Sequence, residues 1–250
     1  MEYRSNLPFN LKTRHLYAVY WVVPLAVLLV VVDMFWLESD IQQTVKKSNA
    51  QILLIGIVFG APHILASMFA YFDKEYLAFY QPKIMAGLSG ALLLASITLF
   101  VLPLNVGLTL LTIINMHHFI GQQAGVARML IGQPIRCFGL WQAALLTNSC
   151  VIAILVGFGP NHNYLQYLPN LYEVLVFYAL FTTLLSIYIV RQVTQWRQAI
   201  YFMMTQAMSL IVTLLLVLDY AFLVVLLPNF VHDVTAVSYT HLTLPTTPYV

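Results

Sequence analysis

The stretch LYAVYWVVPLAVLLVVVDMFW, residues 16–36, decides the fold class of this chain. As a helix rising about 1.5 Å per residue, it is long enough to cross about 30 Å of hydrocarbon. It is too long for the apolar region of a signal peptide and lacks a small-residue cleavage site. We therefore expect a first transmembrane helix that is retained, with Asp33 at the membrane interface near its outer end.

The composition extends this expectation to the whole chain. Hydrophobic residues make up 61% of the 250 residues and charged residues only 8%. Soluble domains carry about 25% charged residues, so most of this surface must face lipid. The net charge of +2 is too small to indicate a nucleic-acid partner. The length accommodates roughly seven or eight spans in one bundle.

Apolar runs predict an all-α, polytopic membrane helix bundle, residues 1–236, with seven complete spans and the start of an eighth. The seven spans are predicted at residues 16–36, 51–72, 84–102, 104–127, 138–158, 171–190 and 199–218. An apolar extension, 219–227, follows the seventh span, and Pro228 is expected to open the eighth at about residue 229.

The last residues, 237–250, do not resemble natural membrane protein sequence. Their first ten letters, VSYTHLTLPT, resemble a translation of the transposase-end adapter DNA used in sequencing libraries. We therefore predict a non-native tail, excluded from fold reasoning, and a natural chain that continues beyond Ala236. The eighth span is then truncated.

Basic residues predict the orientation, because they concentrate on the cytoplasmic side of membrane proteins. With the N-terminus inside, only Lys46 and Lys47 fall outside. The cytoplasmic side then carries Arg4, Lys12, Arg14, Lys74, Lys83, Arg128, Arg136, Arg191 and Arg197. We expect the plasma (inner) membrane of a bacterium.

Two further patterns fit a membrane bundle. Aromatic residues near span ends are expected at the lipid–water interface. They are Tyr17, Tyr20, Trp21, Trp36, Tyr76, Tyr80, Tyr164, Tyr167 and Trp196. Small residues four apart are expected to let helices approach closely. These pairs are Gly56 and Gly60, Ala86 and Gly90, and Gly121 and Gly125.

Histidines inside predicted spans are the most informative polar residues, because polar side chains are costly in lipid and often functional there. They are His63, His117, His118 and His232. The first three lie at nearly the same depth, slightly past the midplane, whereas His232 is expected nearer the outer surface. Two helices that offer imidazoles at one depth could share a ligand.

Polar neighbours extend this candidate site. Asn115, His118 and Gln122 share one helical face because they are three and four residues apart. Together with Gln123 they could line a polar path, and Asp233 could orient His232.

Several histidines with few carboxylates suit iron, copper, zinc or haem. Our leading hypothesis is a non-haem metal oxidoreductase that acts on a lipophilic substrate. The alternatives are a transporter or channel, a haem b protein, and a structural or assembly protein. The sequence contains no HExxH motif and no nucleophile-elbow serine, which argues against a zinc protease and an acyl hydrolase.

Two of these segments, Gly60-Ala61-Pro62-His63 and His118-Phe119-Ile120-Gly121, resemble motifs of the Brp/Blh-type membrane carotenoid oxygenases. The resemblance covers about ten residues. It implies iron held by histidines inside a helical bundle and oxygen-dependent cleavage of a polyene. The second motif departs from the family pattern by the extra Ile120, and Gln122 and Gln123 stand where an acidic residue is expected.

Overall fold

The computed structural model describes residues 17–44, 51–56, 58, parts of 81–100, 101–158, 168–194 and 196–243. These residues form helices and no strand, which confirms the predicted all-α class for this part of the chain. The helices are α2 (Val22–Trp36), α3 (Asp40–Thr44), α6 (Leu104–Ile131), α7 (Phe138–Phe158), α8 (Leu168–Val190), α9 (Trp196–Val217) and α10 (Ala221–Thr243).

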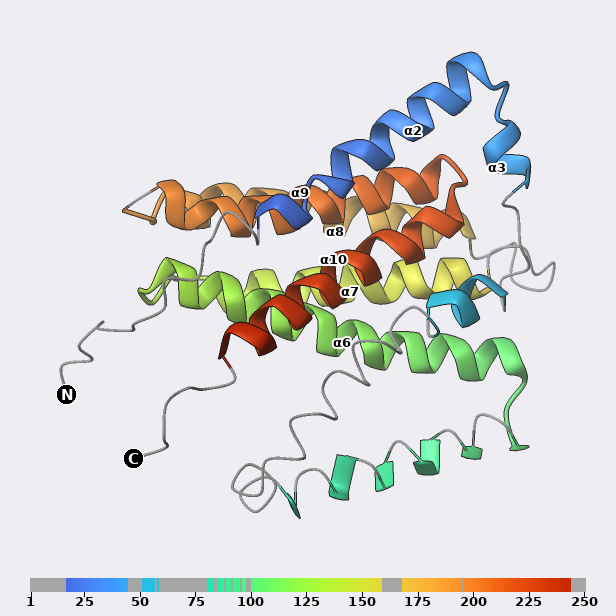
Figure 1. Ribbon diagram of the computed structural model, residues 1–250, viewed down its shortest axis with the longest axis horizontal. Helices are drawn as coiled ribbons and strands as arrows, with labels where there is room; N and C mark the ends of the chain where they lie inside the picture. Colours follow the sequence, from blue (N-terminus) through green and yellow to red (C-terminus); the bar gives the residue numbers. More distant parts are fainter. Residues whose placement is uncertain are drawn as a thin grey trace.

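Four long helices form the body of the bundle. Figure 1 shows α6, α7, α8 and α9 running along the long axis, with α10 crossing them obliquely and α2 inclined away at one end. Helix α7 packs between α6 and α8, and α9 contacts α6, α8 and α10. Short antiparallel connections put consecutive helices side by side, as expected for an up-and-down membrane bundle.

Among the described residues, five helices are long and apolar enough to cross a membrane. They are Tyr17–Trp36, Leu104–Ile131, Phe138–Phe158, Pro169–Val190 and Ala199–Val217. Their outward faces carry large apolar side chains such as Leu28, Phe177 and Leu184. The chain is therefore an integral membrane protein. The predicted spans 51–72 and 84–102 lie largely outside the described residues, although residues 51–56 are helical.

The predicted beginning of the last helix is wrong. Helix α9 ends at Val217, and Asp219 adopts the left-handed conformation with φ of 62°. The amide of Tyr220 donates to the carbonyl of Leu215 at 2.9 Å, which closes a Schellman turn. Helix α10 then begins at Ala221 instead of residue 229.

The prediction placed Pro228 at the start of the helix because proline favours the first turn. In α10 it lies inside the helix. Membrane helices tolerate internal proline where neighbouring groups satisfy the freed backbone. Helix α10 continues to Thr243, into the segment predicted to be non-native; the origin of that segment stays a prediction.

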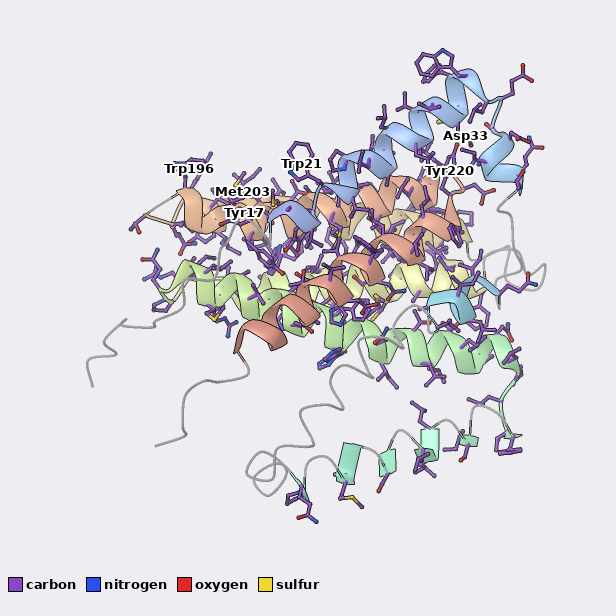
Figure 2. All side chains as sticks on the ribbon, viewed as in Figure 1. Tyr17, Trp21, Asp33, Trp196, Met203 and Tyr220 are labelled. Atoms are coloured by element: carbon purple, nitrogen blue, oxygen red, sulfur yellow. The ribbon has the colours of Figure 1, made fainter. Side chains whose placement is uncertain are left out.

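Asp33 closes the corner between α2 and α3. Its buried carboxylate accepts hydrogen bonds from the amides of Ile41 (2.8 Å) and Gln42 (3.0 Å) and from the Tyr220 hydroxyl (2.8 Å). Gln42 also donates to the Leu218 carbonyl at 2.9 Å. Burial and the bond to Asp33 raise the pKa of Tyr220 to about 12, so its hydroxyl remains a donor. Asp33 therefore ties this corner to the α9–α10 turn (Figure 2).

Glycines mark two close approaches between helices. A Cβ at Gly56 would lie 2.4 Å from Cγ1 of Val225, so segment 51–56 packs directly on α10. A Cβ at Gly157 would lie 2.0 Å from Oγ1 of Thr109, where α7 meets α6. No described atom lies within 4 Å of a Cβ built at Gly121 or Gly125, so those two glycines make no such approach to the described residues.

We predict that Gly157→Ala destabilises the protein by about 1–3 kcal/mol, because the new methyl group collides with Thr109. Thermal unfolding in detergent, followed by circular dichroism, measures the change. Gly139→Ala in the same helix is the matched control, because its Cβ meets nothing within 4 Å. Equal melting temperatures for the two variants would contradict the close approach of α6 and α7.

Candidate functional site: an intramembrane cavity

A cavity of about 80 Å³ lies among α6, α7, α9, α10 and segment 51–56. Its volume is several times the roughly 10–15 Å³ that one water molecule needs. The wall is mainly apolar, and its polar residues are Thr112, Asn115, Gln123, Ser149, Thr205, Ser209, Asn229 and His232. An apolar wall with a few polar groups is typical of a small-molecule site.

Gln123 of α6 is a buried polar residue of this wall with two hydrogen-bonded side-chain partners. Only 2% of it is exposed, and its Oε1 accepts hydrogen bonds from the hydroxyls of Tyr20 (2.9 Å) and Tyr201. The Tyr20 hydroxyl also lies 2.9 Å from Oγ1 of Thr205. The two tyrosine rings pack edge to face with their centroids 5.5 Å apart. This cluster joins α6 and α9 to the turn before α2.

The burial of Tyr20 corrects the sequence interpretation. Tyr20 was predicted to be an interfacial aromatic, yet only 3% of it is exposed. The hydrogen-bonding needs of a phenol explain the difference, because a buried tyrosine requires a polar partner and finds one in Gln123. Trp21 and Trp196, which are 68% and 70% exposed, remain compatible with the interface.

Asn229 of α10 is the second buried amide of the cavity wall. Only 2% of it is exposed, and its Nδ2 donates to the carbonyl of Gly56 at 3.2 Å. Its Oδ1 makes no hydrogen bond with a described residue, and neither does Nε2 of Gln123. The wall therefore offers one acceptor and one donor whose hydrogen bonds the described chain leaves unfilled.

His118 of α6 and His232 of α10 lie together beside this cavity. Their ring centroids are 5.2 Å apart and their planes are inclined by 76°. His232 is 1% exposed and stacks on Phe119 at 3.8 Å between ring centroids. His118 is exposed at the bundle surface. His232 was predicted nearer the outer surface unless the last helix is tilted, and α10 does cross α6 obliquely and brings His232 beside His118 (Figure 1).

The remaining predicted site residues occupy four kinds of position. His63 lies outside the described residues. His117 is exposed on α6, next to His118. Asn115 lines the cavity, whereas Gln122 and Asp233 are half-buried and do not. Within the described part of the chain, no group of three or more His, Cys, Asp or Glu side chains is arranged to hold a metal ion.

A second buried polar cluster was not predicted. Nε1 of Trp141 donates to Gln206 at 2.9 Å, and Gln206 donates to the hydroxyls of Thr182 (3.1 Å) and Thr183 (3.3 Å). It links α7, α8 and α9 through side chains. The sequence signal was a glutamine inside an apolar run, which is costly in lipid without partners.

The fold and the cavity define the class of this protein as an integral membrane helix bundle with an intramembrane cavity. No protein-family model, curated protein or solved structure matches the chain. The resemblance to the carotenoid oxygenases thus rests on the two short motifs, and it remains a hypothesis.

We predict that Gln123→Leu lowers the free energy of unfolding by about 1–3 kcal/mol, because it removes the acceptor of two buried tyrosine hydroxyls. The melting temperature in detergent reports the loss. The neighbouring Gln122→Leu serves as the control and is expected to change stability by less than about 0.5 kcal/mol. If Gln122→Leu costs as much as Gln123→Leu, the tyrosine cluster does not contribute to stability as described.

Proposed function

We propose that this membrane protein is a metal-dependent oxidoreductase that acts on a lipophilic small molecule held in the cavity. His118 and His232 serve as two of its metal ligands. The observation that carries the proposal is the meeting of these two imidazoles, from separate helices, beside an apolar cavity whose wall includes His232. Imidazole is the commonest nitrogen ligand of transition metals.

The separation of the two rings fits shared coordination. An imidazole bound at about 2.1 Å has its ring centre roughly 3.2 Å from the metal. Two adjacent ligands of one metal then have ring centres roughly 5 Å apart, whereas two opposite ligands are roughly 6–7 Å apart. The observed 5.2 Å supports adjacent ligation and supports the non-haem alternative over a haem clamped between this pair.

The chain supplies the surroundings that such a centre needs. The stacking of His232 on Phe119 holds one imidazole in a defined orientation. Apolar residues of α6, α7 and α9 make up most of the cavity wall. A bound iron or copper ion would supply the redox chemistry that side chains lack. In this proposal His63, predicted at the depth of His118, is the third ligand.

Transport is the second candidate function. It rests on two residues of α6, Asn115 and Gln123, which both line the cavity. Gln122, predicted to belong to the same polar path, does not line it. Flux of a small solute into proteoliposomes prepared with a metal chelator would favour this candidate over the oxidoreductase.

We also propose that the N-terminus faces the cytoplasm of a bacterial cell. The connections α6–α7 and α8–α9 lie at the same end of the bundle (Figure 1). They carry Arg136 and Arg191, and Arg128 lies in the last turn of α6. Trp196 marks this end in Figure 2. An excess of basic residues at one end supports a cytoplasmic location for that end.

The proposal predicts one bound transition metal per chain after purification of the full-length protein and reconstitution with iron, copper or zinc. His118→Ala and His232→Ala should each lower metal affinity at least about tenfold, because each removes a ligand. Inductively coupled plasma mass spectrometry and metal titration measure the loss.

His117→Ala is the matched control for this experiment, because His117 is the exposed neighbour of His118. It should keep the full metal content. The absence of metal from the unaltered protein, or equal losses in all three variants, would rule out the proposed centre. A Soret absorption band would instead favour the haem alternative.

A further inference from the structure

We infer that the ligand of the cavity is a lipophilic molecule that ends in a hydroxyl group. The hydroxyl proton is donated to Oδ1 of Asn229. This inference rests on the proposed function, because it names the class of molecule that the same cavity holds.

The orientation of both amides is set by hydrogen bonds on their other atoms. Gln123 holds its oxygen toward the hydroxyls of Tyr20 and Tyr201. Asn229 holds its nitrogen toward the carbonyl of Gly56. Nε2 of Gln123 and Oδ1 of Asn229 therefore have no hydrogen-bond partner among the described residues. Both side chains line the cavity, and each is 2% exposed.

A buried donor and a buried acceptor without partners destabilise a protein, and more so in lipid, where water cannot replace the missing hydrogen bonds. A hydroxyl group satisfies the acceptor of Asn229, because it donates a hydrogen bond. An ether or ketone oxygen only accepts. A carboxylate likewise only accepts hydrogen bonds, so it cannot satisfy Oδ1 of Asn229.

The rest of the wall fits an apolar chain. Leu53, Leu145, Ile152 and Val212 contribute to it, and the cavity is not fully enclosed. The volume of about 80 Å³ accommodates the polar end and the first carbons of such a molecule. The remaining chain would extend out through the open side.

Water is the competing occupant, because it also donates and accepts hydrogen bonds. A series of three matched ligands separates the two occupants. Decanol can donate a hydrogen bond to Asn229, decyl methyl ether can only accept hydrogen bonds, and decane can do neither. We would measure saturable binding of each radiolabelled ligand to the full-length protein in lipid nanodiscs, above that of protein-free nanodiscs.

We expect decanol to bind about tenfold more tightly than the ether, because only the alcohol can donate to Asn229. Asn229→Leu should reduce the ratio of decanol affinity to ether affinity to about one. It should change the ether affinity itself by less than about twofold. Asn148→Leu is the matched control and should retain the preference. Asn148 is also buried with an unfilled Oδ1, but it bonds Thr213 and does not line the cavity.

The outcomes distinguish this inference from the proposed function. Equal binding of alcohol and ether to the unaltered protein would overturn the hydroxyl inference and leave a lipophile site in place. No saturable binding of any of the three ligands would indicate a water-filled cavity and overturn both. The ligand series uses the unaltered protein, so it remains decisive if Asn229→Leu does not fold.

Discussion

A buried polar group of a membrane-spanning helix is costly unless it finds a hydrogen-bond partner, because lipid offers none, and this constraint organises much of the bundle. Asp33 meets it with two backbone amides and the hydroxyl of Tyr220. Gln123 meets it with two tyrosine hydroxyls, and Gln206 with Trp141 and two threonines. Since the apolar faces gain little from association in lipid, these polar contacts and close packing at glycines determine which helices are neighbours.

The cavity is a consequence of where these contacts fall. The Gln206 cluster holds α7, α8 and α9 together on one side, and the Gln123 cluster holds α6, α9 and the turn before α2. Helix α10 is held by the hydrogen bond from Asn229 to the carbonyl of Gly56, and it crosses the bundle obliquely (Figure 1). An oblique helix cannot fill the space between two nearly antiparallel helices along its full length. The unfilled volume lies beside Pro228 and Asn229.

Apolar runs predicted much of the fold, and the bounds of α7, Phe138–Phe158, coincide with a predicted span. The beginning of α10 was not predictable from the position of Pro228, because proline occurs both at helix starts and inside membrane helices. The burial of Tyr20 could not be predicted either, since interfacial and buried tyrosines follow the same sequence pattern. Of the candidate site, the intramembrane histidines and Gln123 stood out as costly polar residues. Asn229, three residues before His232, was not predicted as a site residue, because the predicted last helix begins at that residue instead of at Ala221.

The position of Asn229 on α10 connects the proposed hydroxyl site with the His118–His232 pair. Residues three apart on a helix lie on the same side and differ in height by about 4.5 Å, so Asn229 sits one turn from His232. A hydroxyl bound at Asn229 would therefore bring its own carbon atom close to the His118–His232 pair, while the apolar tail points away. Orientation of a lipophilic molecule is difficult in a wholly apolar cavity, because dispersion contacts are not directional. The acceptor of Asn229, whose amide is fixed by its hydrogen bond to Gly56, supplies that direction in a mainly apolar wall, one turn from a residue proposed to carry the chemistry.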